Sequence, residues 1–181
     1  VDTESNSLYT YREQVCLIQV STDQVDFLID PLRLANKAEL DFFGETLADP
    51  AIEKVLHAAE YDIMVLKRDF GFAFGNIFDT MIAARILGWK NIGLGTILSE
   101  RFGIEVNKSN QRANWGQRPL PLNLVQYAQI DTHFLLRLRD ELHKDLEAGG
   151  HLEEAYELFA EVCSAEWNGG HFDPEGFWHL S

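Results

Sequence analysis

Two acidic residues at the start of the chain, in the stretch VDTES, are the first whose types and spacing could do chemistry. Asp2 and Glu4 are separated by one residue, so in an extended strand their side chains would point to the same face. Two ionised carboxylates placed in this way raise each other's pKa unless a cation lies between them. A metal site is one explanation. The commoner explanation of an isolated D-x-E pattern is a solvated terminal segment whose acids do nothing.

A third acid lies on the apolar face of an expected helix. The sequence from 121 to 147 predicts one uninterrupted helix, and Tyr127 and Asp131 fall four residues apart on its apolar stripe. A buried carboxylate without a partner is costly, so it usually has one, often a metal ion. A salt bridge from Asp131 to a core arginine explains the position equally well. The stripe itself consists of Leu124, Ala128, Leu135, Leu138 and Leu142.

A fourth acid, Asp62, follows a short apolar strand. The strand is expected at 54–59 and the helix that carries Asp62 at 60–71, where the acid shares a face with Leu66 and Phe70. Proteins of the α/β class tend to place active sites at the carboxyl ends of strands. The helix dipole alone also favours an acid in the first turn of a helix. Asp62 is therefore a candidate that needs the other carboxylates for support.

Two neighbouring polar residues have simpler explanations. Asp79 is expected to be the N-cap of the helix that begins at Thr80. His57 is expected to be a hydrogen-bonded core histidine, because nothing near it has the spacing of a zinc site.

The elements that position these residues predict an α/β fold. Two β-rich segments at 15–21 and 24–30 are expected to form a hairpin. The strand and helix around Asp62 and a further strand at 76–80 form a β-α-β unit, so the sheet should be mixed. Further helices are expected at 36–48, 79–88, 93–102 and 151–165.

The charge of the chain argues against a general affinity for nucleic acid. Its 15 Lys and Arg against 29 Asp and Glu give a net charge of -14, the opposite of a basic footprint. The segment 106–118 is a local exception. It has no acid and contains Lys108, Arg112, Arg118 and Trp115, so cations could meet phosphates while the indole stacks on a base. The alternative is a solvated loop with Trp115 in the core.

The size and composition of the chain predict a single domain. It has 181 residues and 46% hydrophobic content, enough for a full core. No apolar run approaches the roughly 20 residues needed to span a bilayer, and no charged-then-apolar leader is visible. We expect a soluble, cytoplasmic protein with no membrane association. Cys16 and Cys163 lack C-x-x-C spacing and are expected to be buried thiols in a reducing compartment.

Three short motifs occur in a fixed order along the chain, and together they resemble the exonuclease motifs of the DEDD superfamily. The segments LADPAIEKVLHAAEYDIMVLKRDFG, FDTMIAARILG and KSNQRANWGQRPLPLNLVQYAQIDTHFLL are similar to ribonuclease D and its relatives, which include the exosome-associated exonuclease of eukaryotes. The motifs are D-x-E (Asp2, Glu4), H-x4-D-x3-L (His57, Asp62, Leu66) and Y-x3-D (Tyr127, Asp131).

The third motif indicates the tyrosine subclass of this superfamily. The residue five before Asp131 is Gln126 rather than histidine. His133 cannot take the place of that histidine, because it lies about 200° away around the helix.

The resemblance implies a ribonuclease H-like fold, with a mixed, partly antiparallel five-stranded sheet flanked by helices. It implies a catalytic domain over 1–165 that begins inside its first strand, and a tail over 166–181 that leads toward an HRDC-type domain. Asn114 precedes Trp115, where members of the family commonly carry an acid.

The resemblance also implies a 3'-5' exoribonuclease that depends on two divalent cations. Four carboxylates without thiols suit Mg²⁺ or Mn²⁺. Asp2 would bridge both ions, Glu4 and Asp131 would complete the site of one ion, and Asp62 would hold the other through water. Tyr127 would orient the attacking water or help remove its proton. The substrate-binding residues are expected to be Thr3, His57, Lys108, Arg112, Trp115 and Arg118.

The expected substrate is the 3' end of single-stranded RNA, from which nucleoside 5'-monophosphates would be released, as in tRNA maturation. One alternative is a DNA-directed 3'-5' exonuclease of the Werner or proofreading type, which shares these motifs. The other alternative is an inactive nucleic-acid-binding scaffold. Because the four acids and the tyrosine of the motifs are all present, the sequence argues against a scaffold.

Overall fold

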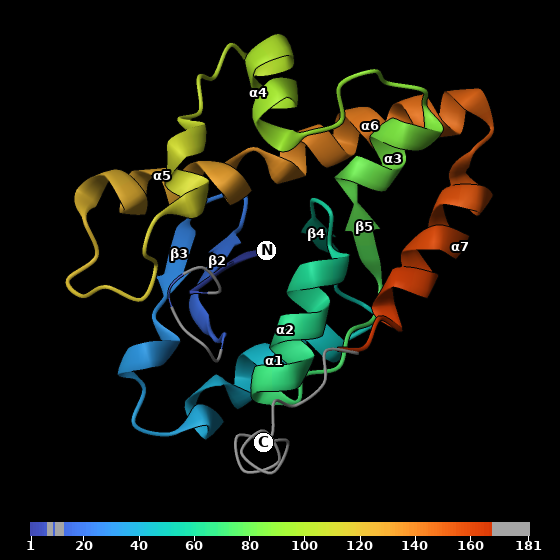
Figure 1. The fold of residues 1–181 in the computed structure, drawn as a ribbon. Coiled ribbons are helices and arrows are strands. Elements are labelled where there is room, and N and C mark those ends of the chain that lie inside the picture. Colours follow the sequence, from blue (N-terminus) through green and yellow to red (C-terminus); the bar gives the residue numbers. More distant parts are fainter. Residues whose placement is uncertain (7–8, 10–12, 168–181) are drawn as a thin grey trace, which may run out of the picture.

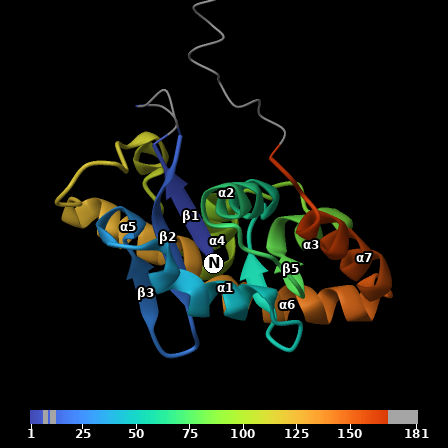
Figure 2. The same cartoon turned by 90° about the horizontal axis from the view of Figure 1, so that it is seen from below.

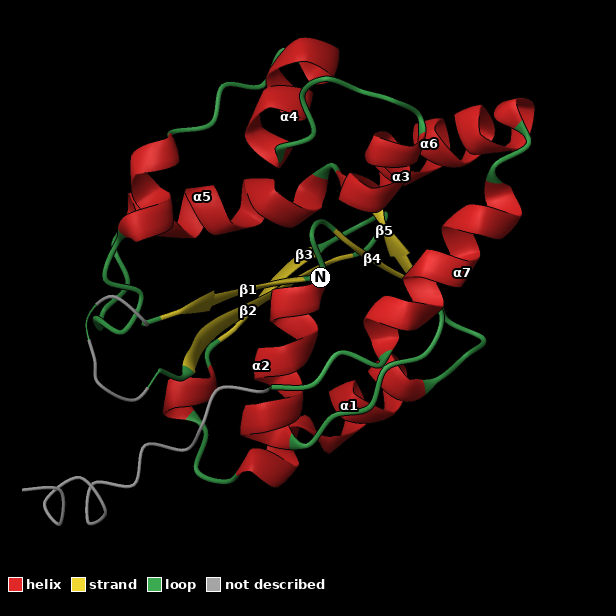
Figure 3. Cartoon of the chain, turned by 45° about the vertical axis from the view of Figure 1, so that its right-hand side comes forward, coloured by secondary structure: helices red, strands yellow, loops and turns green. Residues whose placement is uncertain are grey.

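Five strands lie between two groups of helices in the computed structural model, which describes residues 1–6, 9 and 13–167 (Figure 1). Three helices cover one side of the strands, α4 (Leu94–Phe102), α5 (Leu122–His133) and α6 (Leu135–Gly149), and two cover the other, α1 (Asp41–Ala48) and α2 (Glu60–Phe70) (Figure 3). The predicted α/β class is confirmed. The strands are β1 (Asp2–Ser5), β2 (Val15–Ser21), β3 (Asp26–Ile29), β4 (Lys54–Leu56) and β5 (Ile77–Asp79).

Seven α-helices and three short 3₁₀ helices occur in the described part of the chain. The 3₁₀ helices are η1 (Pro31–Arg33), η2 (Lys37–Leu40) and η3 (Lys108–Arg112). The α-helices are α1 (Asp41–Ala48), α2 (Glu60–Phe70), α3 (Thr80–Ile86), α4 (Leu94–Phe102), α5 (Leu122–His133), α6 (Leu135–Gly149) and α7 (Leu152–Cys163).

The strands form two sheets, which corrects the prediction of a single five-stranded sheet. Strands β1, β2 and β3 form an antiparallel sheet in that order, and β4 and β5 form a parallel pair. The predicted hairpin of β2 and β3 is confirmed. Between the sheets, the nitrogen of Val1 donates a hydrogen bond to the carbonyl oxygen of Val55 at 2.7 Å, but no β-ladder follows. Figure 2 shows the antiparallel sheet on one side of α2, with β5 and α7 on the other.

The long helix predicted over 121–147 is broken at Phe134, so this prediction was wrong in its continuity. Phe134 has φ -95° and ψ -2° and separates α5 from α6. The two helices pack on different sheets. Helix α5 packs on β2 and β3, whereas α6 packs on α3 and β4. The Phe134 ring stacks on Phe102 of α4 with 5.8 Å between the ring centroids. This contact holds the break in place.

Two other boundaries differ from the prediction. The segment 36–48 begins as the 3₁₀ helix η2, with Asn36 and Glu39 forming a capping box, before α1 starts. The strand predicted over 54–59 ends at Leu56, because Ala58 has a φ of 58°. A positive φ cannot continue a strand.

Asp79 fixes the turn that leads into the helix of Asp62. As predicted, its side chain caps α3 and accepts from the backbone nitrogens of Met81 and Ile82. It also accepts from the nitrogens of Ala58 and Ala59 at 3.1 and 2.7 Å. One buried carboxylate therefore satisfies four backbone donors, and it ties the turn after β4 to the start of α3.

The apolar interior consists of distinct clusters of buried side chains around the two sheets. One cluster surrounds β4, β5, α3, α6 and α7, and a second surrounds β2, α1 and α2. A third, smaller cluster lies between β2 and α5 and consists of Cys16, Leu17, Trp115, Leu124, Tyr127 and Ala128. This third cluster backs the site described below.

Three remaining predictions concern the membrane, the thiols and the tail. Among the described residues, no helix is long and apolar enough to cross a lipid bilayer. Both cysteines are free, Cys16 buried and Cys163 half-buried. The tail was predicted over 166–181, and its residues from 168 onward lie outside the described residues.

Candidate active site

Strand β1 and helix α5 bring three acids together. Asp2 and Glu4 come from the same face of β1, and Asp131 comes from α5, which packs on the neighbouring strand β2. Their carboxylate oxygens all lie within 4.8 Å of one another. Among the described residues, no arginine pairs with Asp131, so the alternative of a core salt bridge is excluded for that part of the chain. The structure thus brings together three of the four acids that the sequence analysis singled out.

Burial and mutual repulsion raise the pKa of all three acids. Burial, with Asp131 adding to it, raises the pKa of Asp2 to about 8. Burial and the charges of Asp2, Asp131 and Asp62 raise the pKa of Glu4 to about 10. Burial also raises the pKa of Asp131 to about 7, although a hydrogen bond from Tyr127 opposes the shift. Such a cluster is stable at neutral pH only with protons or cations between the carboxylates.

Asp62 stands behind this group rather than in it. Its side chain is 5% exposed, and it belongs neither to the group of three acids nor to the lining of the cavity in front of them. Its Oδ1 accepts from the backbone nitrogen of Thr3 at 3.1 Å and from the Thr3 hydroxyl at 2.5 Å. Burial raises the pKa of Asp62, with the charge of Asp2 adding to the shift. Asp62 is thus tied to the β1 acids through Thr3.

Thr3 both contacts Asp62 and lines the cavity. Thr3 was expected to bind substrate, but its N–H and its hydroxyl both donate to Asp62. The residue lines the cavity but is only 8% exposed. These two hydrogen bonds tie the Asp62 carboxylate to β1, and Thr3 stays a candidate for substrate contact.

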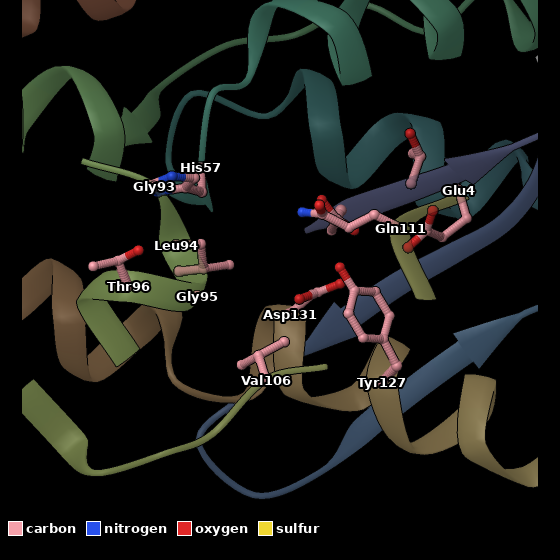
Figure 4. Close-up of a pocket in the computed structure, with 12 residues that line it drawn as sticks. Glu4, His57, Gly93, Leu94, Gly95, Thr96, Val106, Gln111, Tyr127 and Asp131 are labelled. Atoms are coloured by element: carbon pink, nitrogen blue, oxygen red, sulfur yellow. The ribbon is translucent and has the colours of Figure 1, made fainter. Parts of the chain in front are cut away.

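Tyr127 lies beside the Asp131 carboxylate and points into the cavity (Figure 4). Burial raises the pKa of Tyr127, and the charges of Asp131, Glu4 and Asp2 raise it further. The phenol therefore keeps its proton in the metal-free protein. His133, by contrast, is exposed and lies within 2.9 Å of Asp26 through its Nδ1. The assignment to the tyrosine subclass is consistent with this geometry.

Trp115 supports Tyr127 instead of facing a base. Its side chain is 1% exposed, and its ring centroid lies 6.0 Å from that of Tyr127. Because the indole is buried, the prediction that it stacks on a nucleobase is wrong, and the alternative of a core tryptophan is correct.

Arg118 is the second residue of this segment with a corrected role. Its guanidinium donates from Nε and Nη2 to the two carboxylate oxygens of Asp30, at 2.7 and 2.8 Å. Its remaining donors bind the carbonyl oxygens of Cys16, Trp115 and Gln117. Since an arginine has five N–H donors, none is left for a phosphate. Arg118 therefore anchors the loop that carries Trp115.

The other two cations of the segment lie on η3. Arg112 is exposed and pairs with no acid in the described part of the chain. Lys108 begins the same 3₁₀ helix. These two residues are the ones from the basic segment that stay candidates for phosphate contacts.

A cavity of about 420 Å³ lies in front of the three acids. Figure 4 shows His57 and the start of α4 on one side of it, and Glu4, Tyr127 and Asp131 on the other. Part of this lining carries no clear signal in the sequence. Gln111 lies on η3 within the basic segment 106–118, whereas the start of α4 has no side chain whose type indicates chemistry. The additional lining residues are Gly93, Leu94, Gly95, Thr96, Val106 and Gln111.

His57 lines the cavity as a neutral side chain. Its Nδ1 lies 2.9 Å from the Thr80 hydroxyl, which itself donates to the Leu56 carbonyl oxygen at 3.1 Å. The hydroxyl has one proton, so the histidine Nδ1 is the donor in the first contact. Burial lowers the pKa of His57, so the ring offers no positive charge to a phosphate at neutral pH.

The donor set fits a hard divalent cation. Asp2, Glu4 and Asp131 supply carboxylate oxygens, and no thiol lines the cavity. Mg²⁺ and Mn²⁺ prefer such ligands. The raised pKa values also fit, because a bound cation would relieve the repulsion that causes them.

Solved structures share this fold. The catalytic core of RRP6 from Trypanosoma brucei superimposes with a TM-score of 0.88 at 32% identity, covering 99% of this chain and 49% of that one. Ribonuclease D of Escherichia coli, an exoribonuclease involved in structured RNA processing, superimposes with a TM-score of 0.79 at 32% identity, covering 90% of this chain and 43% of that one. The fold is that of an RRP6- and ribonuclease D-like catalytic core.

The family model described as 3'-5' exonuclease matches residues 1–147, so the chain belongs to the 3'-5' exonuclease domain family. The resemblance inferred from the motifs is confirmed. Among curated relatives, exosome complex component 10 of Mus musculus is 37% identical over 99% of this chain, which spans 21% of that protein.

The carboxylate cluster predicts how the stability of the metal-free protein depends on pH. The pKa values of Asp2, Glu4 and Asp131 are raised in the folded state, so the folded chain binds more protons than the unfolded chain. Their contribution to the free energy of unfolding therefore falls as pH rises from about 4 to about 10. Thermal unfolding in excess chelator at about pH 5, 7 and 9 measures this decline.

Asp131→Asn is the control for this measurement, because the amide removes one charge from the cluster. The decline with pH should be shallower in the variant than in the parent. Equal slopes in the two proteins would contradict the coupling of the three acids.

Proposed function

We propose that this chain is the catalytic domain of a divalent-cation-dependent 3'-5' exoribonuclease. It would remove nucleoside 5'-monophosphates one at a time from the 3' end of single-stranded RNA, in 3'-end processing such as tRNA maturation. One observation carries the proposal: the oxygens of Asp2, Glu4 and Asp131 lie within 4.8 Å of one another at an open cavity that Tyr127 also lines.

Two cations, Mg²⁺ or Mn²⁺, would be held by Asp2, Glu4 and Asp131, with Asp62 supporting them from behind Thr3. When bound, such ions stabilise negative charge on a scissile phosphate and make water a better nucleophile. The protein contributes the fixed placement of the ligands. Strand β1 provides two ligands from one face, and the packing of α5 on β2 and β3 provides the third.

Tyr127 would orient the attacking water through its hydroxyl. In the metal-free protein its raised pKa keeps the phenol protonated. With cations bound, the hydroxyl would orient the attacking water or help remove its proton. Trp115 packs against the ring, and this contact restricts where the hydroxyl can point.

The size of the cavity suits one terminal nucleotide. Its volume of about 420 Å³ lies at the low end of the range of about 300–1,000 Å³ for small-molecule sites. Removal of one nucleotide at a time is the reaction that such a cavity supports. His57 and Gln111 line opposite parts of it and would contact the sugar or the base.

Lys108 and Arg112 would contact the phosphates that precede the terminal nucleotide. They lie on η3 beside the cavity-lining Gln111. Two other arginines already form ion pairs with acids of this chain. Arg68 pairs with Glu13 and Asp69, and Arg118 pairs with Asp30.

RNA is favoured over DNA because the chain is similar to an exoribonuclease over 90% of its length. Digestion of 3'-labelled single strands of matched RNA and DNA sequence tests the proposal. The expected result is release of 5'-monophosphates from RNA in Mn²⁺ or Mg²⁺, no release in excess chelator, and none by Asp131→Asn.

Each other outcome of this experiment has a definite meaning. Faster digestion of DNA would replace RNA by DNA as the substrate. Undiminished hydrolysis in excess chelator would overturn the metal-dependent mechanism, and the absence of any hydrolysis with either ion would favour a binding scaffold.

Tyr127→Phe should lower kcat by about 10²- to 10⁴-fold, which is the usual contribution of a positioned proton-transfer group. Only the hydroxyl is removed, so Mn²⁺ affinity measured by calorimetry should stay within about threefold of the parent. A kcat within twofold of the parent would reduce Tyr127 to a packing role.

Salt dependence tests the two cations of η3, Lys108 and Arg112. Each phosphate contact on a single strand contributes about -0.7 to the slope of log affinity against log salt, so replacing both Lys108 and Arg112 by Gln should flatten the slope by about 1.4. The measurement is RNA affinity in Ca²⁺ over a salt series.

Arg118→Gln is the matched control, because it removes a cation of the same segment that is bound to Asp30. It should lower the thermal stability and leave the salt slope unchanged. A slope that flattens in this variant alone would contradict the assignment.

A further inference from the structure

Gln19 is an amide buried in an otherwise apolar strand. It lies in β2, in the sequence VCLIQVS, and its side chain is 0% exposed. Neither its Oε1 nor its Nε2 has a hydrogen-bond partner among the described residues. Buried amide groups in native proteins are nearly always paired, so this one requires an explanation.

The strand register places Gln19 beside the metal-binding acids. In the antiparallel ladder of β1 and β2, Gln19 is the direct partner of Asp2. Directly opposite residues have their side chains on the same face of the sheet, with Cβ atoms about 4.5–5.5 Å apart. An amide with two free donors therefore stands next to the Asp2 carboxylate.

The same face of β2 also meets the helix of Asp131. Ser21 follows two residues after Gln19 and so lies on the same face. Its hydroxyl is 2.7 Å from that of Thr132, the residue after Asp131. Gln19 thus faces the layer between β1 and the turn of α5 that carries Asp131.

We propose that Gln19 is a positioning residue whose Nε2–H donates to the Asp2 carboxylate when that carboxylate is held by a cation. This inference rests on the proposed function. Carboxylates that bind metal ions are themselves usually hydrogen-bonded, and these outer partners tune the metal affinity. Gln19 does not line the cavity, so it acts through Asp2 and contacts neither the substrate nor the ion.

Gln19→Met separates this role from ordinary packing. Methionine has a similar length and no unpaired polar group, so the metal-free protein should become more stable, with a melting temperature about 2–4 °C higher. Mn²⁺ affinity should fall by about 10- to 100-fold, the usual effect of losing an outer partner. The measurements are thermal unfolding of the 181-residue chain in chelator and calorimetric titration with Mn²⁺.

Two control variants match this substitution. Gln126→Met makes the same change at an exposed position of α5, and it should alter neither quantity. Ser21→Ala removes a satisfied hydrogen bond on the same face of β2, so it should lower the melting temperature and leave Mn²⁺ affinity within twofold. Gln19→Leu repeats the test should the methionine variant fail to fold.

The outcomes separate this inference from the proposed function. Mn²⁺ binding by the parent together with equal binding by Gln19→Met, or a lower melting temperature of the metal-free variant, would overturn the role of Gln19 and leave the proposed function intact. Absence of Mn²⁺ binding by the parent would overturn both.

Discussion

The repulsion among Asp2, Glu4 and Asp131 is the constraint on which the rest of the site depends. Three carboxylates with their oxygens within 4.8 Å of one another are a poor arrangement for a stable protein at neutral pH, because burial and like charge both oppose ionisation. The fold maintains the arrangement through backbone structure that the acids do not stabilise, namely the β1–β2 ladder and the packing of α5 on β2 and β3. A site held in this way keeps the three acids together without a cation, so a bound metal ion would relieve repulsion that the fold already carries.

Several polar side chains near the site hold its walls. Thr3 fixes Asp62, and Arg118 fixes the loop of Trp115 through Asp30 and three carbonyl oxygens. Trp115 in turn packs against Tyr127. Residue types common in nucleic-acid interfaces here restrict the position of the Tyr127 ring. The number of groups that can contact a substrate is therefore smaller than the composition of the segment indicates.

The acids of the site could be predicted from the sequence, whereas the roles of the loop residues could not. A carboxylate on an apolar helical stripe, such as Asp131, is anomalous in the sequence alone, and the spacing of Asp2 and Glu4 fixes a shared face. The partner of Arg118 lies 88 residues away, and no local pattern encodes such a contact. The ring of Phe134, the residue at the helix break, stacks on Phe102 of α4, and helical periodicity predicts neither the break nor this contact. Gln19 was visible as a polar residue in the apolar segment VCLIQVS, but its meaning required the register with Asp2.

The net charge of -14 does not oppose the binding of a polyanion at this site. Exposed charges farther than about 10 Å from a ligand are largely screened at physiological salt, so the local balance decides. The four acids Asp2, Glu4, Asp62 and Asp131 contribute to the formal charge, yet two divalent cations would cancel all of them. The adjoining segment 106–118 has no acid. The acidic remainder of the surface then disfavours nonspecific contacts along the strand. In the proposed function, a 3' end would therefore be attracted only where cations are held, and the net charge of such a domain is a poor guide to its substrate.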